Sequence, residues 1–163
     1  MQYSIRPIEA QEVPQLESFL YEAIFQPDEE NLVPRTVLKQ PELRAYIEAF
    51  GKKDDHCLVA LVDDKIIGAV WTRILAEGVR GFGNLDDTTP EFAISLYKQC
   101  RGLGIGTKLM EQMCNHLREK GYAKASLAVQ KANYAVKMYR KAGFTVVGEN
   151  QQEYIMAINL KET

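Results

Sequence analysis

The chain has 163 residues, of which 46% are hydrophobic and 26% charged, and its formal net charge is −2. This length suits one domain with its own core, and the near-neutral charge excludes the broad basic surface that nucleic acids or anionic membranes attract. No apolar run approaches the roughly 18 residues of a membrane span, and the N-terminal residues lack the pattern of a secretory signal.

Hydrophobic periodicity defines the elements of the first half of the chain. Residues 3–8 are predicted as a short strand, residues 9–25 as a helix, and residues 41–50 as a second helix that Pro41 opens and Gly51 ends. Two strand runs, "HCLVALV" and "KIIGAVWTRIL", flank the turn "DDK" and predict a tight hairpin. Residues 76–90 are rich in Gly, Asp and Thr and are predicted as a loop.

The second half alternates strands and helices. The strand "EFAISLY" is followed by a glycine-rich stretch, by a helix that runs to Lys120, and by the strand "KASLAVQ". A helix over "NYAVKMYRKAG", capped by Asn133 and ended by Gly143, precedes a closing hairpin of "FTVVGEN" and "EYIMAINL". Residues 91–130 predict a right-handed parallel crossover between antiparallel hairpins. These elements predict one α/β domain over residues 1–163, with a mixed, mostly antiparallel sheet and helices on both faces.

The cysteines and histidines indicate neither a disulfide nor a metal site. Cys57, Cys100 and Cys114 are odd in number and form no CxxC pair, so a reducing cytoplasm fits best. His56 and His116 lie far apart in the sequence and lack ligand spacing. We therefore expect a cytoplasmic protein without a metal ion.

The stretch "QCRGLGIGTKLM" places Gly102, Gly104 and Gly106 where a helix begins. The first turn of a helix presents free amide N–H groups and partial positive charge. Without Cβ atoms, glycines let an anion approach these groups closely, and Arg101 adds a cation beside them. The order "GIGTK" fails the Walker pattern, and G-x-G-x-G fails the dinucleotide fingerprint. The stretch therefore indicates a phosphate site of another kind, with a flexible strand-to-helix turn as the alternative.

Two motifs in the correct order carry a family resemblance. "RGLGIG" fits [RQ]-x-x-G-x-[GA], and "AVKMYRKAGF", about thirty residues later, fits A-[IV]-x-x-[LMF]-Y-x-x-x-G-F. Both resemble the GCN5-related N-acetyltransferases (GNAT), in which the first motif is the acyl-CoA-binding loop. The resemblance covers most of the chain and implies a twisted sheet of about seven strands with a parallel central pair that splays apart.

The resemblance implies acetyl-CoA as co-substrate and suggests its contacts. The pantetheine arm is expected along the strand before the loop, at Ile94, Ser95 and Leu96. The pyrophosphate is expected on the loop, at Arg101, Gly102, Leu103, Gly104, Ile105, Gly106 and Thr107. Family members often have an Asn seven residues before the motif tyrosine, where this chain has Ala132. Asn133, one residue later, either contacts CoA or only caps the helix.

The resemblance also suggests a proton donor and directs the search for a base. Tyr139 matches the motif tyrosine, whose hydroxyl can protonate the leaving thiolate, and a packing role at helical spacing is the alternative. The glutamate that some members place on the strand after the CoA helix is Leu127 here. Glu91 is therefore the first choice of base, with Asp86 and Asp87 behind it and a solvated turn as the alternative.

The expected function is direct acetyl transfer from acetyl-CoA to a primary amine of a small molecule or protein. Acidic and aromatic residues near the acceptor suit a cationic amine, and they are Tyr21, Glu22, Phe25, Asp28, Glu29, Glu30 and Phe82. A non-catalytic acyl-CoA-binding or sensing module is the alternative, and a subunit that needs a partner chain for its substrate is a third interpretation. Neither nucleic acid nor membrane is expected as a partner, and a homodimer is left open.

Overall fold

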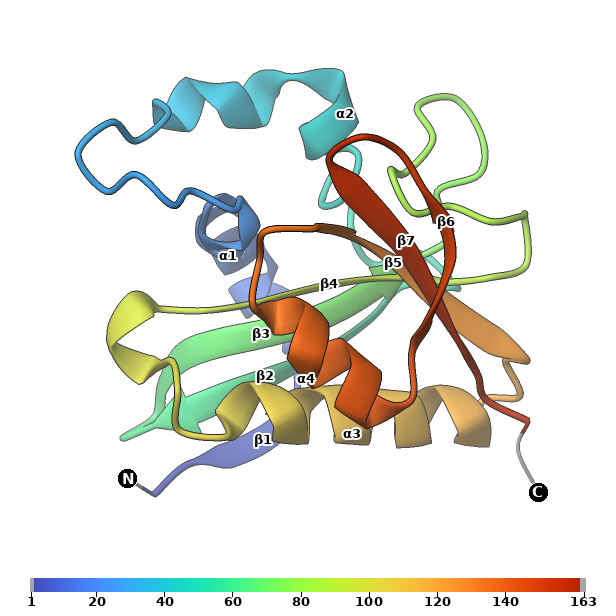
Figure 1. The fold of residues 1–163 in the computed structure, drawn as a ribbon. Helices are drawn as coiled ribbons and strands as arrows, with labels where there is room; N and C mark the ends of the chain where they lie inside the picture. The colour runs from blue at the N-terminus through green and yellow to red at the C-terminus, as the bar shows by residue number, and fades with distance from the viewer. Residues whose placement is uncertain (1, 162–163) are drawn as a thin grey trace.

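A mixed β-sheet organises the molecule. In a computed structural model that describes residues 2–161, seven strands follow the order β1-β2-β3-β4-β5-β7-β6 (Figure 1). All neighbours are antiparallel except β4 and β5, which are parallel. This arrangement confirms the predicted fold. The strands are β1 Ser4–Pro7, β2 His56–Val62, β3 Lys65–Arg73, β4 Glu91–Leu96, β5 Lys124–Gln130, β6 Thr145–Glu149 and β7 Glu153–Asn159.

The predicted hairpin joins β2 and β3. Its turn residues Asp63 and Asp64 have φ values of 51° and 65°, the left-handed conformation that a type I′ turn requires at both central positions. Aspartate tolerates this conformation better than most residues because its short side chain can bond to the local backbone. Val62 and Lys65 pair directly across the turn, and the register shifts at a bulge between Ala60 and Leu61.

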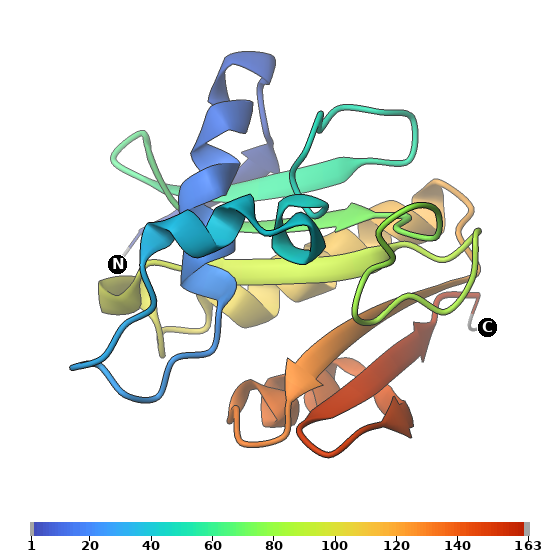
Figure 2. The same cartoon turned by 90° about the horizontal axis from the view of Figure 1, so that it is seen from above.

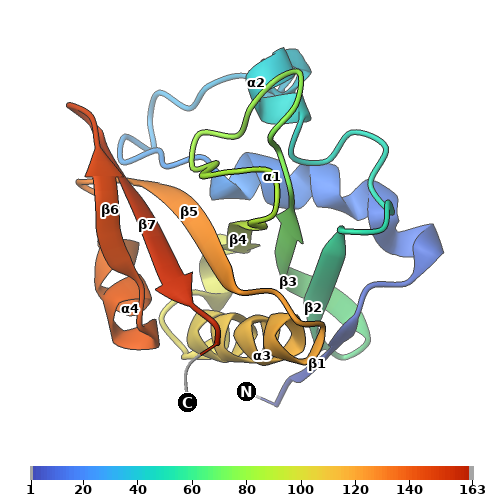
Figure 3. The same ribbon diagram turned by 90° about the vertical axis from the view of Figure 1, so that its right-hand side faces the viewer.

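Helices cover both faces of the sheet, as predicted (Figure 3). Two buried clusters result, one under α3 and α4 with Leu109 and Phe144, the other under α1 with Phe19 and Trp71. The α-helices are α1 Leu16–Ala23, α2 Pro41–Arg44, α3 Ile105–Glu119 and α4 Ala135–Ala142, and short 3-10 helices span Ala10–Gln15, Arg35–Lys39 and Lys98–Cys100.

The first helix begins later than predicted. Residues 10–15 form a 3-10 helix that contains Pro14, and the α-helix starts only at Leu16. Proline has no amide hydrogen and cannot donate the bond to the fourth residue before it that an α-helix needs. The prediction of one continuous helix over residues 9–25 was therefore wrong in this part.

The second helix, predicted to reach Phe50, ends after one turn at Arg44. The Arg44 carbonyl still accepts from the Glu48 amide (2.9 Å), but Ala49 has a φ of 52°, a left-handed conformation that no α-helix continues through. The turns between Arg44 and Ala49 are held from β3. The Arg73 guanidinium donates to the carbonyls of Ala45 (3.0 Å) and Glu48 (2.7 Å), and the Trp71 indole donates to that of Tyr46 (3.0 Å).

Strands β4 and β5 separate soon after they meet. Over the described residues their ladder has a single pair, Glu91 with Ser126, beside which the Ser126 amide donates to the Pro90 carbonyl (3.0 Å). Figure 2 shows β5 and β7 diverging from β4 beyond this point. The rest of β4 therefore has a free edge, which faces the gap.

Candidate active site

A cleft of about 1610 Å³ opens where β4 and β5 separate, and the β4 edge forms one of its walls. The Tyr97 amide donates to a carbonyl of β3 (2.9 Å). Because the hydrogen-bonding direction alternates along a strand, the peptide groups of Ile94 and Leu96 face the cleft. Ser95 lies between them, but its hydroxyl donates to the Phe19 carbonyl of α1 (2.6 Å). The strand thus offers backbone groups to a ligand where the pantetheine arm was expected.

The glycine loop lies at the mouth of α3. Gly102 and Gly104 have φ values of 78° and 84°, and the space around their missing Cβ atoms is open to at least 4 Å. Glycine adopts this left-handed conformation at little cost. Gly104 is the N-cap of α3, so the amides that follow it have no carbonyl one turn earlier to bond to. The loop therefore has free amides with open space beside them, and the binding of an anion there stays a prediction.

The side chains of the other predicted loop residues differ in their surroundings. Ile105 is buried in the core, and Leu103 is 52% exposed. A Cβ on Gly106 would lie 3.4 Å from the sulfur of Met138, so α3 and α4 meet at this glycine. The predicted loop residues that line the cleft are Arg101, Gly102, Gly104, Gly106 and Thr107.

The Arg101 guanidinium is already partnered. Its Nε donates to the Leu96 carbonyl (3.0 Å), and its Nη2 lies 3.2 Å from the carboxylate of Glu22 at the end of α1. Arg101 therefore ties the loop to β4 and α1. Its contact with a phosphate stays a prediction.

Glu91 is the buried carboxyl of the cleft, with 2% of its surface exposed. Its Oε2 accepts hydrogen bonds from the Tyr46 hydroxyl (2.5 Å) and the Gly83 amide (3.0 Å). Burial raises the pKa of Glu91 to about 7, and the nearby Glu153 carboxylate adds to the rise, although the two hydrogen bonds favour the charged form. Such a carboxyl is ionised about half of the time at neutral pH, as suits a general base.

The two other candidate bases lie outside the cleft lining. Asp86 Oδ1 accepts hydrogen bonds from the Thr88 amide (3.0 Å) and hydroxyl (3.1 Å), and Oδ2 lies 3.4 Å from the Lys124 ammonium. Asp87 is exposed on the same turn. The solvated-turn interpretation therefore fits these two residues, but not Glu91.

Tyr139 and Asn133 lie on the α4 side of the cleft. Tyr139 is 8% exposed, packs against the Phe144 ring at 6.1 Å, and has its pKa raised to about 12 by burial. Its hydroxyl thus keeps its proton at neutral pH and can donate a hydrogen bond. The N-cap of α4 is Tyr134 rather than the predicted Asn133, whose Oδ1 accepts from the Ala135 amide (2.9 Å) from one residue further out, and its contact with CoA stays a prediction.

The acidic residues expected around the acceptor are mostly engaged by the protein itself. Glu22 pairs with Arg101, and Glu29 pairs with Lys98. Asp28 accepts hydrogen bonds within its own turn. The residues of this set that line the cleft are Tyr21, Glu22, Phe25, Glu29 and Phe82. This end of the cleft therefore presents aromatic side chains together with carboxylates that are already paired, and a cationic amine as acceptor stays a prediction.

The model of the acetyltransferase (GNAT) family matches residues 18–144, which is most of the chain. The chain belongs to this family. Among curated proteins, the probable N-acetyltransferase camello of Xenopus laevis is 29% identical over 100 residues, which are 59% of this chain and 42% of that protein. The chain thus matches less than half of the length of this relative.

Solved structures of other GNAT proteins share the fold. The PaiA N-acetyltransferase of Thermoplasma acidophilum, solved with coenzyme A, superposes with a TM-score of 0.69 at 20% identity, over 98% of this chain and 99% of that one. The ribosomal-protein-S18-alanine N-acetyltransferase of Escherichia coli gives 0.67 at 14% identity, over 99% and 96%. Similarity at these identities shows the GNAT fold, in agreement with the parallel β4–β5 pair.

Sequence reasoning missed several residues of this GNAT cleft. Tyr46, Gly81 and Gly83 surround the carboxyl of Glu91. The "GFG" triplet inside the 76–90 loop was the available signal for two of them. Lys137 and Lys141 are exposed, line the cleft from α4, and follow the spacing of one helix face.

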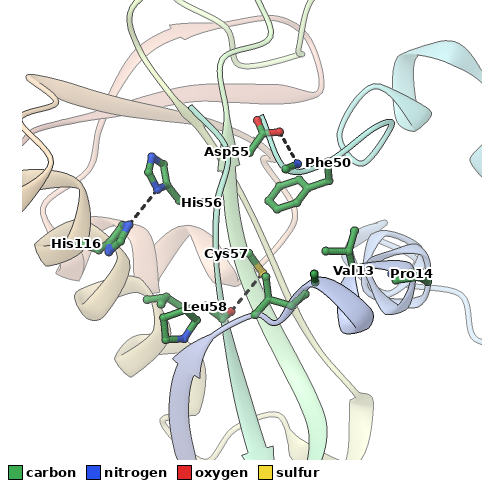
Figure 4. A pocket seen from close by; sticks show the side chains of 12 residues that line it. Val13, Pro14, Phe50, Asp55, His56, Cys57, Leu58 and His116 are labelled. Atoms are coloured by element: carbon green, nitrogen blue, oxygen red, sulfur yellow. Dashed lines mark hydrogen bonds between the residues drawn. The ribbon is translucent and has the colours of Figure 1, made fainter. Parts of the chain in front are cut away.

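The two histidines are in contact, although they are 60 residues apart in the sequence. His116 Nε2 lies 3.0 Å from His56 Nδ1, and His56 Nε2 lies 3.1 Å from the Tyr122 hydroxyl, which donates to Asp54 (2.6 Å). The pair borders a second cavity of about 600 Å³ (Figure 4).

Residues 2–161 hold no group of three His, Cys, Asp or Glu that could ligate a metal. No helix in this part of the chain has both the length and the apolar character needed to cross a bilayer.

Proposed function

We propose that this chain is a single acetyltransferase domain that transfers the acetyl group of acetyl-CoA to a primary amine. The observation that carries the proposal is that one cleft combines an open strand edge, a glycine loop at a helix N-terminus, the buried carboxyl of Glu91 and the phenol of Tyr139. The presence of coenzyme A in the PaiA structure, which has the same fold, supports this choice of cofactor.

The residues along the cleft fit the parts of acetyl-CoA. Backbone groups of β4 at Ile94 to Leu96 suit the amides of the pantetheine arm, which can add to the sheet like a further strand. Amides from Arg101 to Thr107 suit the pyrophosphate, because Gly102 and Gly104 leave the approach open. Lys137 and Lys141 add positive charge on the same wall.

Bound acetyl-CoA supplies a thioester, whose carbonyl carbon forms a bond with the amine as the carbon–sulfur bond breaks. An amine with a pKa of about 10.4 needs a base, since freeing its lone pair at pH 7 costs about 4 to 5 kcal/mol. Glu91 takes this proton. Once the new bond has formed, the nitrogen loses its surplus proton to solvent. The Tyr139 hydroxyl gives its proton to the sulfur as the carbon–sulfur bond breaks and regains one from solvent. The Ile94 peptide group faces the same space and stabilises the polarised carbonyl oxygen.

A thiol-release screen tests the function. The chain is mixed with acetyl-CoA and a panel of primary amines that includes small molecules and peptides, and binding of acetyl-CoA is measured separately by calorimetry. Release that depends on the amine, and that falls in Glu91→Gln, is the expected result. Binding without release for any amine would instead favour a non-catalytic acyl-CoA-binding module.

The acceptor and the location are part of the same proposal. The acceptor is an amine on a small molecule or a peptide, and the aromatic acceptor end favours one that carries an apolar group. Cys57, Cys100 and Cys114 are all free and buried, which supports a cytoplasmic location.

A further inference from the structure

Three hydrogen bonds converge on the carboxyl of Glu91 and on the phenol beside it. Tyr46 Oη donates to Glu91 Oε2 (2.5 Å), and the Gly83 amide donates to the same oxygen (3.0 Å). The Phe82 amide donates to Tyr46 Oη (2.9 Å). Two consecutive amides of the β3–β4 loop therefore hold the two oxygens of the Tyr46–Glu91 pair.

The second carboxyl oxygen of Glu91 is fixed by space rather than by bonds. Oε1 is buried, and no hydrogen-bond partner for it exists among residues 2–161. It occupies the room that Gly81 leaves, since a Cβ there would stand 1.9 Å from Oε1. Among side chains, only the hydroxyl of Tyr46 therefore bonds to this carboxyl within residues 2–161, beside the backbone amide of Gly83.

Tyr46 is itself held from β3. The Trp71 indole donates to the Tyr46 carbonyl (3.0 Å), and Arg73 donates to the carbonyls of Ala45 and Glu48 on either side. The Arg73 guanidinium also forms a buried ion pair with Asp55 (3.0 Å). The Tyr46 ring stacks near Phe82, at 6.3 Å and 14°. A phenol held in this way is pre-organised, so its hydroxyl stays within hydrogen-bond distance of the Glu91 carboxyl.

We propose that Tyr46 is a positioning residue for the base of the acetyl transfer: its hydroxyl holds the Glu91 carboxylate in one orientation and keeps it ready to accept the proton of the amine. The inference rests on the proposed function. This inference also explains the turn after α2: its backbone is held by hydrogen bonds from β3, and its tyrosine, Tyr46, reaches the carboxyl of Glu91.

The charges around Glu91 make this role measurable. The groups that face it are the Tyr46 hydroxyl and the Glu153 carboxylate of β7, while its cross-strand neighbour Arg73 is paired with Asp55. Burial and Glu153 oppose ionisation of Glu91, and the Tyr46 hydrogen bond favours it. Loss of the hydroxyl should therefore leave the base protonated over a wider range of pH.

The test compares Tyr46→Phe with Tyr122→Phe. Both changes remove a phenol that donates to a carboxylate, but Tyr122 donates to Asp54 outside the cleft (2.6 Å). In Tyr46→Phe the acidic limb of the kcat/KM profile should move up by about one to two pH units, so that activity at pH 7 falls by about 5- to 50-fold and approaches the wild-type value at high pH. Tyr122→Phe should keep the wild-type profile.

A carbon-13 NMR titration of the Glu91 carboxyl reads the same effect without any substrate. An upward move of its midpoint in Tyr46→Phe supports the inference even if no amine is acetylated, in which case only the proposed function fails. An unmoved midpoint, or an activity loss that is equal at every pH, overturns the inference. Should Tyr46→Phe not fold, Gly81→Ala is the second variant: its Cβ displaces Oε1, and the same upward move is expected.

Discussion

Replacement of Glu91 by Gln should change the stability of the folded protein relative to the wild type by an amount that becomes more favourable as the pH rises. Burial raises the pKa of Glu91 to about 7, against the ordinary 4.5 of an unfolded chain. Below pH 4.5 the carboxyl is neutral in both states. As the pH rises from 4.5 to 7, the unfolded chain releases the proton first, so the folded state loses stability. Once both states are ionised, this difference corresponds to roughly 3 kcal/mol.

Glutamine cannot ionise and keeps the shape of the side chain, so its variant escapes this loss. The stability difference between Glu91→Gln and the wild type should therefore grow by about 3 kcal/mol in favour of the variant between pH 4.5 and pH 8. Urea unfolding at several pH values measures it, because the other titrating groups are shared by both proteins and cancel in the difference.

Glu119→Gln is the matched control, since Glu119 is an exposed carboxylate on α3 and its loss removes the same formal charge. A stability difference for Glu91→Gln that stays constant from pH 4.5 to pH 8 would refute the argument. It would mean that Glu91 ionises in the folded protein as easily as in the unfolded chain, and the case for Glu91 as a base tuned to neutral pH would fall with it.

Three further predictions concern the cofactor loop, the proton donor and the histidine pair. Gly104→Val should weaken acetyl-CoA binding in calorimetry by about 10-fold or more, while Gly121→Val, at a similar φ of 91° with open space around it, shares the backbone strain and should leave binding intact. Equal weakening in both would point to strain alone. Tyr139→Phe should lower kcat by about 10- to 100-fold with little change in CoA affinity, and an unchanged kcat would leave Tyr139 a packing role. Burial lowers the pKa of His56 and His116, so the contribution of this pair to stability should fall as the pH drops below about 6.5, opposite in sign to that of Glu91. His116→Gln should flatten this acid limb in thermal unfolding, and an unchanged slope would contradict a contribution of His116 to it.

The order of strands and helices could be predicted because its signals are local. Alternation in "EFAISLY" assigned Phe92, Ile94 and Leu96 to one face of the strand. The structure packs these side chains on the α3 and α4 side, and Ala93 and Tyr97 on the α1 side. Successive side chains of a strand point to opposite faces of the sheet, so the face of each residue follows from its position along the strand alone.

Partners that are distant in the sequence could not be predicted. Arg101 bonds to Glu22, 79 residues away, and Tyr46 bonds to Glu91, 45 residues away. The turns after the second helix also have distant partners, since Arg73 of β3 donates to the carbonyls of Ala45 and Glu48. In each case a side chain from another element competes for a group whose local partner the sequence suggests, and only packing decides the outcome.

The glycines of this chain also show that a sequence does not reveal which group will occupy the space that a glycine leaves. At the N-terminus of α3 they were interpreted as room for a phosphate, a ligand that is not part of the chain and so cannot be seen in its sequence. In the 76–90 loop, "GFG" was interpreted only as part of a turn, yet in the structure its two glycines make room for the carboxyl of Glu91. The Gly83 amide bonds to one oxygen of Glu91 at 3.0 Å, and the other oxygen fills the place of a Cβ at Gly81. In both places glycine lets an oxygen approach the backbone closely. In the 76–90 loop this oxygen belongs to the carboxyl of Glu91, whereas at the start of α3 a phosphate of the cofactor stays a prediction.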